Sequence, residues 1–346
     1  MNILFVWTGI TGYTGDCWRA LAALPGIRLK VLVEAPRSVP DAAFDAAHEL
    51  RGLDCTVVER GAPFDRDAIR GAVAAFAPDV AFIVGWHAAL PRFVATDPAF
   101  DGVRKVLAFD MPFAWTPRKL LAPIALRRYL SCFCAAFVPG AEAARYARWL
   151  GFRPDAIRQG LFSTRLDRFA DAAGRKLAGG VPHSFLYVGR YAPEKGLDTL
   201  AEAYGIYRGH VHDPWPLNCA GKGDALPKGE GIVDLGFVPP DRLAGAYGAN
   251  GVFVLPSRFE PWGVALAEAC GSAMPAICSD AVGARREMLD GNGLVFRAGD
   301  ARSLADAMSR MHRLGDAARV EMAKRSLELA RPYSSDEWAR RVAGFF

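Results

Sequence analysis

Short apolar runs rich in β-branched and aromatic residues alternate along the chain with longer amphipathic stretches. This alternation predicts βα units and therefore an α/β fold with parallel sheets. In the first half we expect strands near 2–7, 29–34, 55–58, 79–84, 104–109 and 133–138, and helices near 16–24, 41–52, 65–76, 119–130 and 140–150. These elements predict one Rossmann-like domain.

The segment 170–182 (ADAAGRKLAGGVP) has no apolar period, which predicts a linker between two domains. After it we expect strands near 184–188, 216–220, 232–235, 251–255, 275–278 and 293–296, and helices near 196–207, 239–247, 263–272, 301–314 and 316–330. A last helix opens with the capping run Ser334-Ser335-Asp336. The pattern predicts Rossmann-like domains at 1–170 and 171–330, and a C-terminal helix within 331–346 that packs back on the first domain.

Composition and charge narrow the function classes. The 346 residues are 51% hydrophobic and 23% charged, which is ordinary for a globular protein and excludes a disordered chain or a coiled coil. No apolar run approaches the ~18–20 residues that span a bilayer, and the amino terminus lacks a signal peptide's basic start, so we expect a cytoplasmic protein. Lys and Arg outnumber Asp and Glu by 21 to 16 in residues 1–170, whereas the second half is balanced at 21 to 21. That excess suits an anionic substrate or a membrane surface, and it is too small to predict nucleic-acid binding.

A glycine-rich string, TGITGYTG at 8–15, follows a predicted strand and precedes a predicted helix. It matches the cofactor loop of extended short-chain dehydrogenases, in which Glu34 would bind a ribose diol. Tyr191 and Lys195 even supply the Y-x-x-x-K string of such enzymes, but Pro193 between them argues against the helix that would place both on one face. An NAD(P)-dependent epimerase or reductase is therefore an alternative, and a tight turn that needs small residues explains the glycines equally well.

Two strings in the second half carry charges suited to a sugar nucleotide. In GRYAPEKG at 189–196, the planar fork of Arg190 and the mobile charge of Lys195 could hold a diphosphate. In PSRFEPWGVALAEA at 256–269, Glu260 lies in a loop and Glu268 about two turns into the following helix, whose amino end favours phosphate. Each carboxylate could accept hydrogen bonds from vicinal hydroxyls. Taken singly, these residues could equally be solvated charges or partners of neighbouring cations.

The joint order and spacing of G-R-x4-K-G and E-x7-E resemble the retaining glycosyltransferases of glycosyltransferase family 4, which have the GT-B fold. The strings Gly221-Lys222-Gly223 and Gly236-Phe237-Val238 fall between the two, as they do in that family. The resemblance is strong over 185–300 and weaker elsewhere. It implies two Rossmann-like domains that face each other across a cleft.

The resemblance also implies a site for a nucleoside-diphosphate sugar in the second domain. Glu260 would bind the transferred sugar, and Glu268 would bind the ribose. The diphosphate would be bound by the side chains of Arg190 and Lys195 and by the backbone amides of Gly263, Val264 and Ala265. Val238 and Gly221 would lie at the nucleoside. Fixed cations and a helix amino end can stabilise the charge of a departing diphosphate, so we expect no metal and no cofactor. The D-x-D string Asp65-Arg66-Asp67 opens a helix and is better interpreted as a cap.

The acceptor is expected to bind in the first domain, at the carboxyl edge of its sheet. Candidates are the loop with Gly12 and Gly15, His87 after one strand, and Asp110 after the next. The family often has a histidine where this chain has Phe109, so which of His87 and Asp110 assists catalysis stays open. The stretch 115–130 mixes four cations with apolar residues, and either rests on the inner membrane surface or is an ordinary basic helix interrupted by Pro123.

We therefore expect a metal-independent retaining glycosyltransferase of the hexosyltransferase type. It would move a sugar from a UDP or GDP type donor to a glycan or lipid-linked hydroxyl acceptor in the biosynthesis of a surface polysaccharide or glycoconjugate. A noncatalytic relative that only binds nucleotide sugars is the second alternative.

Overall fold

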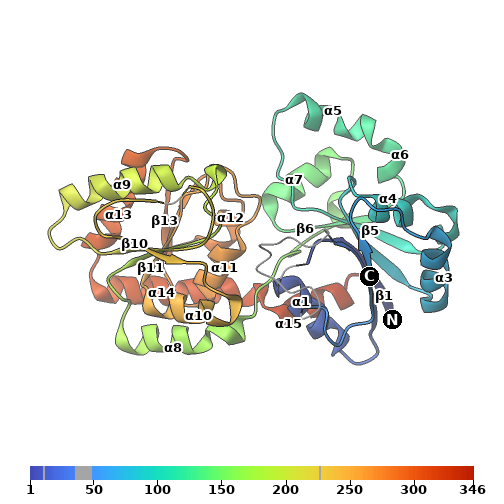
Figure 1. Ribbon diagram of the computed structural model, residues 1–346, viewed down its shortest axis with the longest axis horizontal. Coiled ribbons are helices and arrows are strands. Elements are labelled where there is room, and N and C mark those ends of the chain that lie inside the picture. Colours follow the sequence, from blue (N-terminus) through green and yellow to red (C-terminus); the bar gives the residue numbers. More distant parts are fainter. Residues whose placement is uncertain (11, 36–48, 226) are drawn as a thin grey trace. The chain divides into compact units, whose positions relative to one another are not determined.

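The computed structural model describes residues 1–10, 12–35, 49–225 and 227–346. The chain divides into two units, the first made of 1–163 and 335–346 and the second of 164–334 (Figure 1). Residues 164–170, which the sequence pattern assigned to the first domain, belong to the second unit in this division.

The first unit contains a seven-stranded parallel sheet in the order β3-β2-β1-β4-β5-β6-β7. Its strands are β1 (Asn2–Thr8), β2 (Arg28–Ala35), β3 (Cys55–Glu59), β4 (Val80–Val84), β5 (Arg104–Ala108), β6 (Ala135–Val138) and β7 (Ile157–Gln159). Side chains alternate across β1, so that Ile3 and Phe5 enter one core while Leu4 and Val6 enter another on the opposite face. The sequence did not predict β7, because three partly exposed residues do not form an apolar run.

Helices cover both faces of this sheet. They are α1 (Gly12–Ala22), α3 (Arg66–Phe76), α4 (Ala89–Thr96), α5 (Pro117–Ala125), α6 (Arg127–Leu130), α7 (Ala141–Trp149) and α15 (Ser335–Ala343). The helix expected at 41–52 lies mostly outside the described residues. The single helix expected at 119–130 is divided at Leu126. Helix α4 was missed because it has only eight residues and no capping side chain marks its start.

The C-terminal helix α15 packs against α1 and completes a core of the first unit. The Trp338 indole donates a hydrogen bond to the Leu161 carbonyl at 2.8 Å. The Phe345 ring meets Phe82 and Phe137 edge to face at 5.2 and 5.6 Å between centroids. The last residues of the chain are therefore part of the hydrophobic core built by the first strands.

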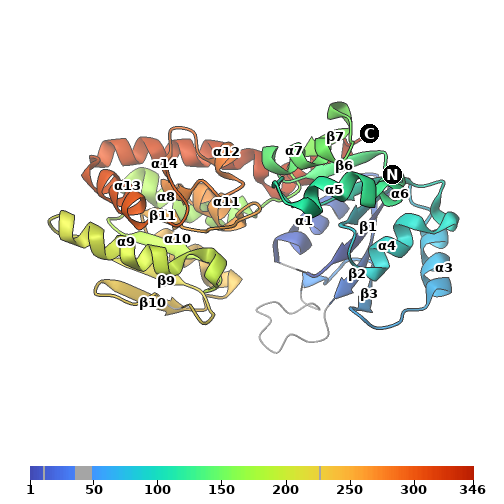
Figure 2. The ribbon, with the colours of Figure 1, turned by 90° about the horizontal axis from the view of Figure 1, so that it is seen from above.

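The second unit contains a six-stranded parallel sheet in the order β10-β9-β8-β11-β12-β13. Its strands are β8 (Phe185–Val188), β9 (Leu217–Ala220), β10 (Ile232–Gly236), β11 (Val252–Leu255), β12 (Ala276–Ser279) and β13 (Gly293–Phe296). Its helices are α8 (Ala170–Gly179), α9 (Leu197–His210), α10 (Pro240–Ala249), α11 (Val264–Gly271), α12 (Arg285–Met288), α13 (Ala301–Arg313) and α14 (Asp316–Ala330). The helices α9 and α13 cover one face of the sheet, and α8, α10 and α14 cover the other (Figures 1 and 2).

The linker expected at 170–182 is wrong, because most of it forms α8. Alanine, lysine, arginine and leucine all favour a helix, and α8 buries Ala172, Ala173 and Lys176 against α10 and α14. The Lys176 ammonium donates to the carbonyls of Tyr247 and Ser272 at 2.7 and 3.2 Å. A lysine on the buried face and small alanines beside it hide the apolar period that would have revealed this helix.

No helix in the described part of the chain is long and apolar enough to cross a bilayer.

Candidate functional site

Each sheet has one place where the strand order reverses. Because all strands in a sheet are parallel, their carboxyl ends share one edge, and ligands of such sheets bind outside that edge at the reversal. The reversal lies between β1 and β4 in the first unit and between β8 and β11 in the second. Each unit therefore offers one candidate site.

At the reversal in the second unit, the structure brings together Lys195, which follows β8, and Glu260, which follows β11. The Lys195 Nζ atom lies 2.6 Å from Glu260 Oε2, and the two side chains are 15% and 14% exposed. The Ser257 hydroxyl donates to the same carboxylate oxygen at 3.4 Å. The ammonium and the carboxylate are thus fixed in a largely buried pair, although they are separated by 65 residues in the sequence.

The backbone explains why these two residues meet. The 3₁₀ turn Pro193–Lys195 is held against the loop after β11, because the N–H groups of Arg258 and Phe259 donate to the Glu194 carbonyl at 2.8 and 3.3 Å. Gly196 permits the close approach: its φ is +69°, and an added Cβ would lie 2.3 Å from the Pro256 carbonyl oxygen.

The Arg258 side chain fastens the same two segments. Its guanidinium donates to the Pro193 carbonyl at 3.1 Å, to the Asp198 carboxylate at 2.6 Å and to the Thr199 hydroxyl at 2.9 Å. Arg258 therefore links the loop that carries Glu260 to the turn that carries Lys195 and to the start of α9. The sequence places this arginine in the string 256–269 but gives no signal of its role.

Arg190 lies beside this pair with its guanidinium in solvent. Its side chain is 72% exposed and pairs with Glu194 at 2.6 Å. It lines a pocket of about 520 Å³ with Tyr191, Ala192, Pro193, Lys222, Gly223, Asp224 and Ala225. The buried Tyr187 hydroxyl donates to the Arg190 carbonyl at 2.8 Å, and burial together with the negative charge of Glu260 raises its pKa. The second cation of this pocket, Lys222, was noted in the sequence only as part of a glycine string.

The amino end of α11 lies next to Glu260. Gly263 precedes the helix with φ +109°, and no side chain caps this end. An added Cβ on Gly263 would lie 3.3 Å from the Glu260 Cγ atom. The first-turn amides of Val264 and Ala265 therefore belong to the same site as the Lys195–Glu260 pair, and the helix dipole favours an anion there.

Glu268 lies farther along α11, where the Tyr247 hydroxyl donates to its Oε2 atom at 2.9 Å. Burial raises the pKa of the Glu268 carboxyl to about 7, against the opposing effects of this hydrogen bond and of the Arg168 charge. A carboxyl with this pKa changes its protonation state near neutral pH.

Two further predicted residues lie at the same sheet edge. Gly221 follows β9, where its N–H donates to the Gly236 carbonyl at 2.8 Å. An added Cβ on Gly221 would lie 1.9 Å from the Gly189 carbonyl oxygen, so close backbone packing alone demands this glycine. Val238 follows β10 and is partly exposed.

The first unit holds a pocket of about 610 Å³ at the reversal between β1 and β4. It is lined by Thr8, Glu34, Arg60, Gly61, Val84, Gly85, Trp86, His87, Ala88, Ala89, Phe109, Asp110 and Met111. The structure thus brings His87 and Asp110 to one pocket. Arg60 was missed, because a single arginine after a strand carries no signal in the sequence.

Charges around this pocket affect His87. Partial burial lowers the pKa of the imidazole, and the positive charges of Arg118 and Arg92 lower it further. The imidazole is therefore predominantly neutral at pH 7, as a proton acceptor must be.

Glu34 is 3% exposed, and its carboxylate accepts a hydrogen bond from the Leu90 N–H at 2.8 Å. It caps α4, whose preceding residue Ala88 has no capping side chain. This contact gives Glu34 a structural role in place of the ribose contact of the dehydrogenase alternative.

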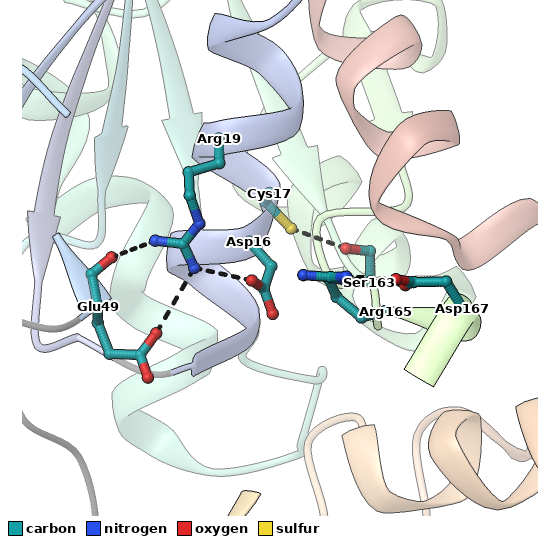
Figure 3. A network of polar contacts seen from close by, with 7 residues as sticks. All are labelled: Asp16, Cys17, Arg19, Glu49, Ser163, Arg165 and Asp167. Atoms are coloured by element: carbon teal, nitrogen blue, oxygen red, sulfur yellow. Dashed lines mark hydrogen bonds and ion pairs between the residues drawn. The ribbon is translucent and has the colours of Figure 1, made fainter. Parts of the chain in front are cut away.

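The predicted acceptor-side glycines begin α1 and are not among the residues that line the first-unit pocket. The Arg19 guanidinium donates to the Glu49 carbonyl and to the Asp16 carboxylate, each at 2.7 Å (Figure 3). An added Cβ on Gly15 would lie 2.6 Å from that Glu49 carbonyl oxygen. Packing therefore explains Gly15, while Gly12 forms the start of the helix.

The two remaining strings have structural explanations. Asp65 caps α3 as predicted, accepting from the N–H groups of Asp67 and Ala68 at 2.9 and 3.0 Å. Tyr191 and Lys195 do not share a helix: the Tyr191 hydroxyl bonds Asp234 at 2.8 Å, whereas Lys195 pairs with Glu260. Across the described ranges, no group of three or more His, Cys, Asp or Glu residues is placed to hold a metal ion.

The second unit contains a segment that is similar to a known protein family. Residues 182–313 match the family model described as Glycosyl transferases group 1. The chain is 28% identical over 170 residues to an alpha-D-kanosaminyltransferase of Streptomyces kanamyceticus, covering 46% of this chain and 42% of that protein. It is 30% identical over 213 residues to a D-inositol 3-phosphate glycosyltransferase of Nocardia farcinica, covering 56% of this chain and 46% of that protein. The chain therefore matches less than half the length of these relatives.

Solved structures agree over the whole chain. The sucrose-phosphate synthase of Thermosynechococcus elongatus superposes with a TM-score of 0.73 at 16% identity, covering 100% of this chain and 98% of that one. The Anabaena protein HepE in complex with UDP superposes with a TM-score of 0.74 at 15% identity, covering 100% and 99%. The chain therefore has the GT-B fold, and the candidate site of the second unit lies within the segment that matches the glycosyltransferase family model.

Proposed function

We propose that this protein is a retaining glycosyltransferase of family 4 that transfers a hexose-type sugar from a nucleoside diphosphate to a hydroxyl acceptor. The observation that carries the proposal is the Lys195–Glu260 pair beside the amino end of α11, at the strand reversal of the second unit. The match of residues 182–313 to a glycosyltransferase family supports it, since the match contains this whole site.

The donor's diphosphate takes up negative charge when its bond to the sugar breaks. Arg190, Lys195 and the first-turn amides of α11 can stabilise that charge, which makes a divalent cation dispensable. Glu260 would accept hydrogen bonds from the transferred sugar. Glu268 would hold the ribose, with Val238 and Gly221 at the nucleoside. The neighbour in complex with UDP supports a nucleotide of this type.

We expect the reaction to retain the configuration at the anomeric carbon. Glu260 would not act as a covalent nucleophile, because it is paired with Lys195 and would bind hydroxyls. The acceptor oxygen would attack from the face that the diphosphate leaves, and the diphosphate would take the acceptor proton. The product then retains the anomeric configuration of the donor.

The acceptor would bind in the first-unit pocket. The neutral His87 imidazole and the Asp110 carboxyl there would orient its hydroxyl. An O-antigen chain mannosyltransferase of Escherichia coli is 32% identical over 121 residues, covering 32% of this chain and 32% of that protein. This relative supports a role in surface polysaccharide or glycoconjugate synthesis.

Donor turnover tests the proposal. The purified protein is incubated with UDP- and GDP-hexoses, with and without EDTA, and nucleoside diphosphate release is measured. We expect release from one donor that EDTA does not abolish, and proton NMR of the product should show a retained anomeric centre. An inverted product would contradict the retaining mechanism.

The Glu260→Gln variant separates an enzyme from a protein that only binds nucleotide sugars. We expect it to lose turnover while nucleotide affinity changes little. Donor binding by the wild-type chain without turnover, with all acceptors tried, would favour the noncatalytic alternative.

A further inference from the structure

One face of the first unit combines exposed apolar side chains with arginines. The helix α5 shows Arg118, Leu121 and Ile124 at spacings of three residues, which place them on one side of the helix. Leu121 and Ile124 are 59% and 77% exposed, and Trp115, just before the helix, is 72% exposed. Arg127 and Arg128 follow in α6 and are also exposed. We call these six residues the basic apolar face.

The charge of this region is predominantly positive. Between residues 111 and 150 the chain has six cationic side chains, Arg118, Lys119, Arg127, Arg128, Arg145 and Arg148, and a single acidic one, Glu142. An exposed apolar surface with a cationic border matches an anionic lipid surface, because its apolar side chains enter the lipid while its arginines meet the headgroups.

The opposite sides of α5 and α6 are anchored to the unit. The Lys119 ammonium donates to the Pro112 carbonyl at 2.6 Å, and the Lys119 carbonyl accepts from the Trp149 indole at 3.1 Å. The buried Tyr129 of α6 donates to the Gly85 carbonyl at 2.7 Å. The exposed apolar side chains therefore project from a fixed support, and burying them in lipid needs no unfolding of these helices.

The same face adjoins the first-unit pocket. Asp110 and Met111 line the pocket and lead directly into the segment that carries Trp115. Tyr129 bonds Gly85, another lining residue, and the charge of Arg118 acts on His87. A surface bound to this face would therefore lie beside the pocket proposed for the acceptor.

We infer that the basic apolar face of α5 and α6 docks the protein on an anionic lipid bilayer. Docking there would place the first-unit pocket at the headgroup level, where a lipid-linked hydroxyl acceptor is found. Membrane binding itself needs neither a donor nor turnover, so it stands or falls independently of the proposed reaction.

Sedimentation with vesicles tests the inference on the full chain. Vesicles of phosphatidylcholine alone are compared with vesicles containing 30% phosphatidylglycerol. We expect the protein to sediment with the anionic vesicles only. This binding should be lost in 1 M salt, because the electrostatic screening length falls from about 10 Å at about 0.1 M salt to about 3 Å at about 1 M. Failure to bind anionic vesicles, or equal binding to both kinds, would overturn the inference.

Two variants locate the surface. Arg127→Gln with Arg128→Gln should weaken binding about thirty-fold, since each cation contributes about a factor of five. Leu121→Asn with Ile124→Asn should weaken it by at least about tenfold through lost apolar insertion. All four side chains are exposed, so we expect unchanged circular dichroism spectra and melting temperatures.

The control variant removes two arginines from a helix of the second unit. Arg302→Gln with Arg310→Gln removes the same charge from exposed positions of α13 and should leave binding unchanged. An equal loss in this control would overturn the assignment of the face. A second result would also overturn it: the wild-type chain does not bind vesicles, sedimentation velocity shows a dimer, and the Leu121→Asn, Ile124→Asn variant is a monomer. The face would then bind a second copy of the chain.

Discussion

The two candidate sites occupy equivalent places in their sheets, yet they are built differently. In the second unit, Lys195 and Glu260 belong to two continuous strings that the backbone presses together at the reversal between β8 and β11. In the first unit, the pocket collects one or a few residues from the ends of five strands. A continuous string can be recognised in a sequence, whereas residues gathered one by one require the fold.

The two sites also differ in how their charges are satisfied. In the second unit, Arg190 pairs with Glu194, Lys195 with Glu260 and Arg258 with Asp198. In the first unit, His87 lies in the field of Arg92 and Arg118, both positive. A diphosphate that enters the second site therefore competes with the carboxylates that already pair with the cations of that site. Substitutions in this site should for that reason change its geometry as well as its charge.

The largest expected effect tests the ion pair of the second site. Lys195→Ala removes a fixed cation from the departing diphosphate, and kcat/KM for the donor should fall on the order of 10²–10³-fold. Steady-state kinetics measures this, with Arg310→Ala on the exposed side of α13 as the control. A loss below about threefold would exclude Lys195 from the reaction.

The next effect tests the arginine that fastens the site. Arg258→Met does not substitute Lys195 or Glu260, but it removes the hydrogen bonds that join the two segments carrying them. Because the pair would then be less well aligned, kcat should fall by up to about 10²-fold. Arg258→Lys keeps the charge without the fork and should restore only part of the rate. The free energy of unfolding measured in urea should change little, because the Arg258 side chain is 40% exposed. Equal rates in all three proteins would show that the turn is aligned without Arg258.

A smaller effect concerns pH. Because the pKa of Glu268 is raised to about 7, its ionised fraction increases about tenfold between pH 6 and pH 8. If the ionised carboxyl holds the ribose, nucleotide affinity should rise by about that factor over the same range. Glu268→Gln should remove this pH dependence.

The stability effect of Glu268 has the opposite sign. Its raised pKa means that the folded state favours the protonated form, so stability from this group is full below its ordinary pKa of 4.5 and falls as pH rises toward 7. Urea titrations of the wild type and Glu268→Gln at pH 5 and pH 8 measure this difference. A parallel loss of stability in both proteins would assign the effect to another group.

The smallest effect concerns the first unit. Glu34→Gln weakens the cap on α4 and should lower stability by about 1 kcal/mol without changing nucleotide affinity. A calorimetric melting scan and a nucleotide titration check both parts. A loss of nucleotide affinity in this variant would instead support the dehydrogenase alternative, in which Glu34 at the end of β2 binds a ribose.

The sequence predicted the strands of both sheets except β7, because most of them are apolar runs, whereas β7 has only three residues and two of these are exposed polar side chains. It missed α8, since a lysine on its buried face interrupts the apolar period, and α4, which has only eight residues and no capping side chain at its start. In the second site it named Lys195 and Glu260 but gave no role to Arg258, whose partners lie 59 to 65 residues away along the chain. In the first-unit pocket it found His87 and Asp110 and missed Arg60, because solitary residues acquire meaning only when strand order is known.

The proposed function requires the second unit to bind a nucleoside diphosphate through the cations at its strand reversal. Isothermal titration of the wild-type chain and of the Arg190→Ala, Lys195→Ala double variant with UDP, GDP, ADP and NAD tests it most directly. We expect one nucleoside diphosphate to bind the wild type and the double variant to lose this binding. NAD binding that the double variant retains, without binding of any nucleoside diphosphate, would show that these cations do not form a donor site.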